Sequence, residues 1–335
     1  LDREFTDNRM QELSREVFEI LENLSNLPNW HFQVSEELQA ILDKRVDPCV
    51  VKANGLAAGK GVIVCNTVSE SLDAIHLIME DRAFGEAGDT VLIEEFMAGQ
   101  EVSVLALVDG RTIWVLDLCQ DHKQVGEGDI GPNTGGMGAY SPAPLLDDEA
   151  MEFVEREILV PAVDGMRRDG IEYRGVLYAG IMLTHAGPKV LEFNCRFGDP
   201  ETQPLMVRLQ GDLVDILWRT ASGELADAEI TFDEKVACCV VMCSEGYPSD
   251  YAKGKTITGI DGAQASEDIV VFHAGTTLSD GALTTSGGRV LGVTALKDDL
   301  ATARDAANEA CEKIEFDGAF WRHDIGCRVL EHRSV

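Results

Sequence analysis

The sequence predicts a protein of mixed α+β and α/β class with two or three domains. Short apolar runs of strand length recur along the chain, and longer segments with helical spacing lie between them. One pair of these runs brackets a loop rich in glycine and lysine at 50–64. The chain has 335 residues, of which 45% are hydrophobic and 26% are charged, so it can bury a sizeable core.

The first 48 residues predict a helical linker. Apolar residues recur at helical spacing over 6–25, where Thr6 or Asp7 can cap the helix and Pro28 follows its end. A second short helix is expected over 35–42.

The segment 50–64 predicts a strand, a glycine loop and a second strand. Glycine lets backbone approach a bulky anion, exposed N–H groups in such a loop form an anion-binding nest, and Lys52 and Lys60 add positive charge. The loop is not a Walker A motif, because Asn54 stands where that motif has its first glycine and Gly61 where it has Ser or Thr. Two strands joined by a glycine loop over a nucleotide are similar to the small lobe of an ATP-grasp fold. The alternative is a plain hairpin with a solvated tip.

The rest of the chain alternates between strands and helices. Up to residue 222 we expect a helix at 69–79, a strand at 91–96, a strand at 112–118, a long glycine-rich loop at 121–140, a helix at 146–168 kinked by Pro161, and a hairpin of 176–183 with 189–194. From about 225 onward we expect strands at 236–242, 269–273 and 289–294 and a helix at 300–314.

The last strand of that hairpin carries a polar row. Alternation places Val190, Glu192, Asn194 and Arg196 on one face and the apolar Leu191, Phe193 and Cys195 on the other. Carboxylate and amide oxygens suit Mg²⁺ (or Mn²⁺), which proteins commonly hold with one or two groups beside phosphate oxygens. Arg196 is placed to neutralise a phosphoryl group in transfer. A half-exposed strand with a polar outer face is the alternative.

Composition excludes several classes of function. The net charge of −31 repels nucleic acid and anionic membranes, and it is typical of adaptation to a saline cytoplasm. No apolar run reaches membrane-spanning length, and the first residues do not form a signal peptide. Nine scattered cysteines indicate free thiols in a reducing cytoplasm; Cys238, Cys239 and Cys243 are expected to pack in a core rather than to bind zinc.

Four stretches resemble one enzyme family. Residues 52–61 (KANGLAAGKG) resemble the K-A-D-G-L-A-A-G-K-G signature of phosphoribosylamine–glycine ligases, enzymes of de novo purine synthesis. Residues 120–123 (QDHK), 131–142 (GPNTGGMGAYSP) and 191–203 (LEFNCRFGDPETQ) match further motifs of that family in the same order. The resemblance runs from about Val50 to the C-terminus and is weak before it.

The resemblance implies an ATP-grasp fold, in which two α+β lobes grip ATP, with a C-terminal mixed α/β domain. We therefore assign 1–48 to a linker, 49–110 to the small lobe, 111–222 to the large lobe and 225–335 to the C-terminal domain. The family's N-terminal domain, a module of about 100 residues, is expected to be missing from this chain and to act as a partner in cis or in trans.

The resemblance also implies roles for individual residues. Lys60 and Arg196 are expected to be catalytic, and Glu192 and Asn194 to bind the metal. ATP is expected to contact Lys52, Gly55, Gly59, Lys60, Gly61, Glu94, Glu95, Phe96 and Glu101. The substrate side is expected to be formed by Asp121, Lys123, Asn133, Thr134, Gly135, Gly136, Asp199, Pro200 and Glu201.

The implied reaction joins glycine to phosphoribosylamine through a glycyl phosphate, with ATP as phosphoryl donor. Such an acyl phosphate hardly needs a general base, so His122 is expected to be structural. Asn54 and Gln124 depart from the family's usual Asp and Arg, and both stand beside motif residues. The alternatives are another ATP-grasp ligase or carboxylase with a different acceptor, and a nucleotide-binding fragment without catalysis.

Overall fold

The computed structural model describes residues 48–55, 57 and 61–332. The helices predicted at 6–25 and 35–42, together with Gly59 and Lys60, lie outside the described residues. The chain divides into two compact units, 1–97 (unit 1) and 98–335 (unit 2), and each is described by itself.

The described part of unit 1 is a three-stranded antiparallel sheet packed against one helix. The strand order is β2-β1-β3, with β1 at Cys49–Ala53, β2 at Val62–Cys65 and β3 at Val91–Glu95. Helix α3 (Val68–Met79) is capped by the Thr67 side chain and packs Ile75 and Ile78 against Val51. A short 3₁₀ turn, η1, covers Gly85–Gly88. The two strands predicted on either side of the glycine loop pair as β1 and β2, and these strands and the predicted helix are confirmed.

A four-stranded antiparallel sheet forms the first half of unit 2. Its order is β11-β10-β4-β5, with β4 at Gln100–Val108, β5 at Ile113–Val115, β10 at Gly175–Thr184 and β11 at Gly187–Asn194. The predicted hairpin is β10–β11. We predicted that the small lobe would extend to residue 110, but β4 pairs with β10 and β5, and unit 1 ends at Met97.

The helix predicted at 146–168 changes its winding at Pro161. It forms α4 (Asp148–Val154), one π-helical segment η2 (Glu155–Leu159) and α5 (Val160–Arg168). The Val160 N–H bonds the Glu155 carbonyl, five residues back. Because proline has no N–H to donate, a widened turn directly before Pro161 accommodates it without breaking the helix.

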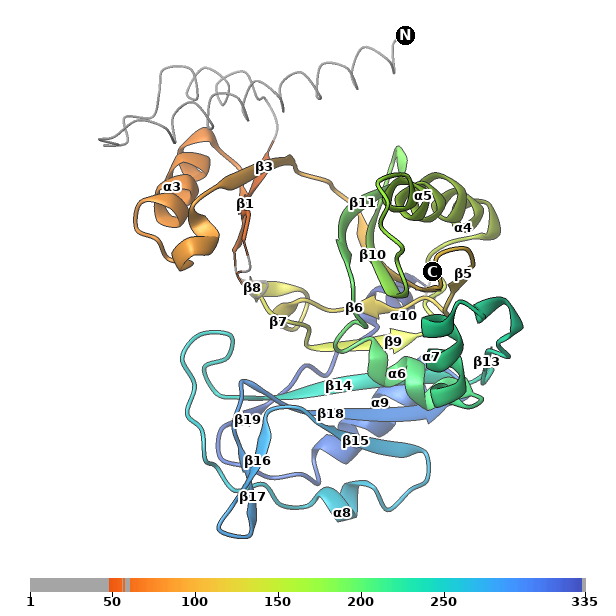
Figure 1. Ribbon diagram of the computed structural model, residues 1–335. Coiled ribbons are helices and arrows are strands. Elements are labelled where there is room, and N and C mark those ends of the chain that lie inside the picture. Colours follow the sequence, from red (N-terminus) through yellow and green to blue (C-terminus); the bar gives the residue numbers. More distant parts are fainter. Residues whose placement is uncertain (1–47, 56, 58–60, 333–335) are drawn as a thin grey trace. The chain divides into compact units, whose positions relative to one another are not determined.

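A second sheet joins the C-terminal region to the middle of the chain (Figure 1). Its order is β15-β18-β14-β9-β6, and β19 also pairs with β14. The C-terminal strands are β14 (Val236–Ser244), β15 (Ile269–His273), β18 (Arg289–Lys297) and β19 (Ala319–Phe320), and α9 (Leu300–Cys311) packs on them. The strands and the helix predicted here are confirmed.

The segment predicted as a long loop at 121–140 is largely extended structure. It contains β6 (Gln120–Asp121), β7 (Gln124–Gly126), β8 (Ile130–Asn133) and β9 (Gly138–Ser141). Strand β9 pairs with both β14 and β6, so the predicted large lobe and C-terminal domain share one sheet. The sequence did not predict these strands because the segment is rich in glycine, which is rare in strand interiors.

The remaining elements are α6 (Thr202–Arg208), β12 (Leu209–Gln210), α7 (Leu213–Ser222), η3 (Leu225–Asp227), β13 (Thr231–Phe232), α8 (Ile260–Ala263), β16 (Thr276–Ser279), β17 (Ala282–Thr285) and α10 (Cys327–His332).

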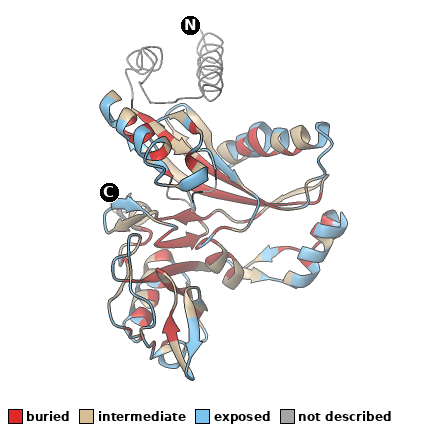
Figure 2. Ribbon diagram, turned by 60° about the vertical axis from the view of Figure 1, so that its left-hand side comes forward, coloured by how far each residue is buried: buried red, intermediate tan, exposed pale blue. Residues whose placement is uncertain are grey.

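The central strands of the two larger sheets of unit 2 are buried (Figure 2). Cys238, Cys239 and Cys243 lie in β14 with no exposed surface, which confirms their predicted packing role. Within the described ranges, no helix is long and apolar enough to cross a membrane, and no group of three or more His, Cys, Asp and Glu side chains is arranged to hold a metal ion by itself.

Candidate functional site

One face of the first sheet of unit 2 carries a group of polar side chains, and it is called the polar face below. Ser103 lies opposite Gly180, Gly180 opposite Glu192, and Tyr178 opposite Asn194, so these side chains project to the same side. The other face packs Val104, Ala179 and their neighbours against α4 and α5. Further along the polar side, Leu105 and Val176 are buried in a separate core cluster, so only the part of this face around Glu192 and Asn194 is available for chemistry.

The predicted alternation along β11 is wrong at Val190. Val190 pairs with Ile181 and Glu192 pairs with Gly180, so Leu191 is an extra residue that forms a β-bulge. Val190 consequently turns toward the α4–α5 core, away from the face that carries Glu192. Sequence spacing could not show this, because a bulge depends on the partner strand.

Glu192 and Asn194 stay together on the polar face. The Asn194 Nδ2 lies 3.1 Å from Glu192 Oε1, and Gly180 leaves the face open beside them, since a Cβ there would be 3.4 Å from Glu192 Cγ. A carboxylate next to a carboxamide is a donor set that fits Mg²⁺ or Mn²⁺ once the amide is turned to present its oxygen. Arg196 is exposed, and its Nη1 donates to the Phe197 carbonyl at 2.8 Å.

Lys123 lies among carboxylates. Its Nζ is 3.2 Å from Asp121 Oδ2 and 3.3 Å from Glu101 Oε1. Burial opposes the charge of Lys123, but Asp121 and Glu101 outweigh it and raise the pKa of Lys123 well above its usual range. Three of the predicted residues therefore meet at one point of unit 2.

Asp121 is the member of this group whose negative charge is least well compensated. Burial, reinforced by the charges of Glu201 and Glu101, raises the pKa of Asp121 to about 7, although Lys123 acts in the opposite direction. Its Oδ1 is buried and has no hydrogen-bond partner among the residues that the structure describes. A buried carboxylate with one unsatisfied oxygen favours its neutral form.

Glu201 is buried behind the polar face. Ser103 Oγ and Tyr178 OH both donate to Glu201 Oε1 at 2.9 Å, and a Cβ on Gly198 would lie 2.4 Å from Glu201 Oε2. We predicted that Asp199, Pro200 and Glu201 would open a helix whose N-terminus attracts anions. In the structure α6 has seven residues, and the Glu201 side chain is held by the sheet.

The loop at 133–136 closes over Asp121. Thr134 donates to the Lys123 carbonyl through its N–H (2.7 Å) and its hydroxyl (2.8 Å), and Gly136 N–H donates to Thr134 Oγ1 at 3.0 Å. At Gly136 φ is +114°, and a Cβ there would lie 2.7 Å from Asp121 Oδ1 and 2.4 Å from Pro200 Cδ. Only glycine fits this position. Asn133 ends β8 and is exposed.

Two functional candidates escaped sequence reasoning. Arg289, the first residue of β18, contacts both the 133–136 loop and Asp199. Tyr247 accepts a hydrogen bond from the Gly135 N–H at 2.9 Å. An arginine after two glycines and a lone tyrosine carry no motif, so no sequence signal distinguishes them.

His122 connects this region to the C-terminal segment. Gly326 N–H donates to His122 Nε2 at 3.1 Å. Burial, together with the nearby Arg328 and Arg322, lowers the pKa of His122 to about 3. A neutral imidazole that accepts a backbone hydrogen bond agrees with the structural role expected for it.

Unit 1 places its predicted nucleotide residues around β1. Lys52 Nζ lies 2.5 Å from Glu94 Oε2. The Gly55 N–H donates to the Ala87 carbonyl at 2.9 Å, and a Cβ on Gly55 would lie 2.5 Å from Ala87 Cα. A Cβ on Gly61 would lie 2.9 Å from Ala53 Cβ. Close packing explains both glycines, and their contact with nucleotide stays a prediction. Glu95 ends β3, and Phe96 is partly exposed.

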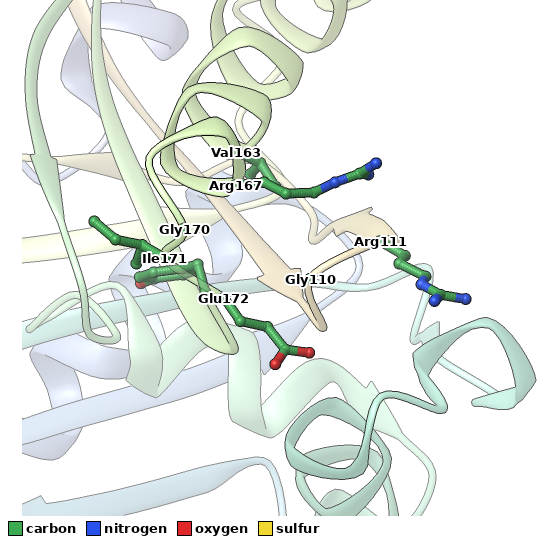
Figure 3. Close-up of a pocket in the computed structure, with 8 residues that line it drawn as sticks. Gly110, Arg111, Val163, Arg167, Gly170, Ile171 and Glu172 are labelled. Atoms are coloured by element: carbon green, nitrogen blue, oxygen red, sulfur yellow. The ribbon is translucent and has the colours of Figure 1, made fainter.

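A hollow of about 400 Å³ lies elsewhere in unit 2 (Figure 3). Its lining includes Arg111, Arg167 and Glu172 but none of the residues predicted for the site. It lies against the end of α5, where Arg167 also complements the negative end of the helix dipole.

Comparison with known proteins gives consistent matches. Residues 23–202 match the family described as phosphoribosylglycinamide synthetase, ATP-grasp (A) domain, and residues 237–328 match the C domain of the same synthetase. Phosphoribosylamine–glycine ligase of Rhodopirellula baltica is 55% identical over 282 residues, 84% of this chain and 64% of that protein. The enzyme of that name from Ralstonia nicotianae is 51% identical over 300 residues, 89% of this chain and 71% of that protein.

A solved structure agrees with these matches. The crystal structure of phosphoribosylamine–glycine ligase from Thermotoga maritima superposes with a TM-score of 0.79 at 33% identity, covering 94% of this chain and 80% of that one. The ATP-grasp fold expected from the sequence is thereby confirmed.

Proposed function

Because the chain belongs to the phosphoribosylamine–glycine ligase family, we propose that it serves the ATP-dependent ligation of glycine to 5-phosphoribosylamine. The products are glycinamide ribonucleotide, ADP and phosphate, in a step of de novo purine biosynthesis. The observation that carries the proposal is the polar sheet face of unit 2, on which Glu192 and Asn194 form an adjacent oxygen-donor pair.

The reaction divides into two transfers. An oxygen of the glycine carboxylate attacks the γ-phosphorus of ATP, the bond to ADP breaks, and glycyl phosphate forms. The amine of phosphoribosylamine then attacks the glycyl carbonyl, a C–N bond forms, and the C–O bond to phosphate breaks, with the amine proton passing to the departing phosphate or to solvent. Both steps depend mainly on positioning and on neutralising negative charge.

In unit 2, Glu192 and Asn194 are the residues that would hold a divalent cation. Bound there, Mg²⁺ or Mn²⁺ would supply charge neutralisation at the phosphates. Arg196, exposed two residues further on, adds a permanent positive charge beside the pair. Lys123 supplies the cation for an anionic group of the substrate, such as the glycine carboxylate, and Asp121 and Glu101 hold its ammonium in place.

Unit 1 is proposed to supply the nucleotide residues. Lys52 is held by Glu94 at the end of β1, next to the glycine loop. Gly55, Gly59, Lys60, Gly61 and the chain at Glu94–Phe96 are the other unit 1 members of the set that the family resemblance assigns to ATP. The remaining member, Glu101, lies on β4 of unit 2. The structure does not describe Gly59 and Lys60, so their part in the proposal comes from the sequence alone.

We also propose that the reaction takes place in the cytoplasm. All nine cysteines are unpaired, and seven of them are buried. Free buried thiols are typical of proteins from a reducing compartment.

The test is direct trapping of the acyl phosphate. The chain is incubated with ATP, magnesium, glycine and hydroxylamine, which converts glycyl phosphate into glycine hydroxamate. We expect hydroxamate and ADP only when glycine and ATP are both present, and faster ADP release when phosphoribosylamine replaces hydroxylamine. Because this first transfer needs no phosphoribosylamine, it tests the glycine step separately from the acceptor.

Variants sharpen the test. Glu192→Ala removes a proposed metal ligand from an exposed position, so we expect loss of both products with an unchanged melting temperature. Glu149→Ala, a change of the same kind on the exposed side of α4, serves as the matched control. Wild-type turnover in Glu192→Ala would remove the metal assignment. Nucleotide binding without glycine-dependent ADP release would favour the fragment alternative, and release that depends on another carboxylate would favour another ligase.

A further inference from the structure

We propose that Arg289 is a positioning residue that fixes the two substrate loops, 133–136 and 198–201, relative to each other. The proposal rests on the proposed function, because it assigns these loops to the substrate. Arg289 belongs to neither loop; it begins β18 in the C-terminal part of the chain. It acts through the backbone of the loops and is not placed on the reacting atoms.

The contacts of Arg289 reach both loops through one guanidinium group. Its Nη1 donates to the Gly135 carbonyl at 2.7 Å and to the Asp199 carbonyl at 2.9 Å. Its Nη2 donates to Asp199 Oδ2 at 2.9 Å, and Nη1 lies 3.3 Å from Asp199 Oδ1. The planar fork of arginine suits this paired recognition of a carboxylate. Asp199, predicted to contact substrate, is therefore engaged by Arg289 in this structure.

The Gly135 peptide is held from both sides. Arg289 binds its carbonyl, while its N–H donates to the Tyr247 hydroxyl at 2.9 Å. A Cβ on Gly135 would lie 2.9 Å from Arg289 Cζ, so only glycine lets the guanidinium approach this closely. Both clamping side chains come from beyond residue 240, which gives the C-terminal region a part in shaping the substrate side.

The loop needs such a clamp for a physical reason. Gly135 and Gly136 have wide backbone freedom, and free glycines lose much entropy when they are ordered. The loop must nevertheless pass within contact distance of Asp121 and Pro200. A misplacement of about 1 Å near reacting groups can slow catalysis on the order of 100-fold.

The first measurement separates kcat from KM in three variants. In Arg289→Ala we expect kcat to fall about 10- to 100-fold with little change in the KM for ATP. Arg289→Lys keeps the charge but cannot contact both loops as a fork, so its kcat should stay near that of Arg289→Ala. Millimolar guanidinium should restore part of the kcat of Arg289→Ala. The control is Arg219→Ala, which removes an exposed arginine paired with Asp215 on α7.

The second measurement is deuterium exchange over residues 133–137, which does not need turnover. Arg289→Ala should speed exchange of these amides, Tyr247→Phe should speed it mainly at Gly135, and Arg219→Ala should leave it unchanged. If Arg289→Ala fails to fold, both the kinetic measurement and the exchange measurement are made on Arg289→Lys and Tyr247→Phe instead.

The outcomes divide as follows. Unchanged exchange in the Arg289 variants overturns the inference, as does faster exchange with wild-type kcat, or full kcat in Arg289→Lys. Slower kcat with faster exchange supports it. If the wild-type chain itself shows no glycine-dependent turnover, the proposed function fails, and the exchange rates alone then decide whether Arg289 fixes the loop.

Discussion

At the scale of single residues, Asp121 forms an ion pair with Lys123 but also lowers the stability of the folded chain. One carboxylate oxygen meets Lys123 at 3.2 Å, while the other is buried without a partner in the described part of the chain. A group left in this state lowers stability, and proteins commonly tolerate such groups where function needs them. The pKa of about 7 means that Asp121 changes charge in the neutral range.

We predict that Asp121→Asn stabilises the protein above neutral pH. The pKa of Asp121 is higher in the folded chain than its ordinary 3.8. The folded state therefore favours the protonated carboxyl, and the associated stability is present below pH 4 and lost as the pH rises through 7. Asparagine imitates the protonated form at every pH. Its free energy of unfolding should exceed that of wild type by a few kcal/mol at most at pH 8 and match it at pH 4.

Urea unfolding at the two pH values measures this difference. Asp261→Asn, an exposed change on α8, should show no such pH dependence. Equal stability of Asp121→Asn and wild type at pH 8 would show that the Asp121 charge is compensated after all.

At the scale of elements, the hairpin β7–β8 is held by the C-terminal segment. Arg322 is 1% exposed and binds Asp129, at the hairpin turn, at 2.9 Å and Asp324 at 2.7 Å. Its Nη1 also donates to the Gln124 carbonyl. Burial alone would raise the pKa of Asp324, but hydrogen bonds from Arg322 and the Gly128 N–H lower it to about 2. This hairpin leads directly into the 133–136 loop.

We predict that Arg322→Met destabilises the chain much more than Arg328→Met. Methionine keeps most of the volume but leaves Asp129 and Asp324 as partly buried charges without their main partner, which costs about 3–5 kcal/mol. Arg328 also pairs with Asp129 but is 23% exposed, and losing such a partly solvated pair costs about 1 kcal/mol or less.

Chemical denaturation of the two variants beside wild type measures the contrast. Similar losses in both variants would mean that the hairpin does not depend on the buried arginine. Exchange over 124–133 should rise in Arg322→Met, because the hairpin loses its fixed attachment.

At the scale of the whole molecule, the main feature is the large excess of negative charge. Asp and Glu number 59 against 28 Lys and Arg, which gives a net charge of −31. Against this background, the proposed site residues include cations that are each held by a carboxylate: Lys52 in unit 1, and Lys123 and Arg289 in unit 2. The remaining surface repels itself, and this repulsion opposes the compact state.

We predict that potassium chloride raises the melting temperature in a saturating manner. Salt screens the repulsion, and the Debye length falls from about 10 Å at 0.1 M to about 3 Å at 1 M. Most of the gain should therefore occur below about 1 M. Thermal unfolding from low to high salt measures it. A melting temperature independent of salt, or one that keeps rising linearly as solute exclusion would produce, would contradict adaptation by surface charge.

Much of the fold could be predicted from the sequence, because its signals are local. The strands around the glycine loop, the helix α3, the hairpin β10–β11 and the helix α9 each follow from the spacing of apolar residues and from turn residues. The pairing of Glu192 with Asn194 also follows from local alternation. The motifs at 52–61, 120–123, 131–142 and 191–203 identify the family, because each is a contiguous stretch of sequence.

Other features depended on partners distant in the sequence. The bulge at Leu191 depends on β10, the strands β6 and β9 depend on β14, and Glu201 is fixed by Ser103 and Tyr178. Arg289 reaches its loops across about 90 and 150 residues of chain. The sequence by itself determined most of the elements, the family and the types of group at the site. Only the tertiary structure decided which of those groups meet, since burial, register and long-range hydrogen bonds exist only once the chain has folded.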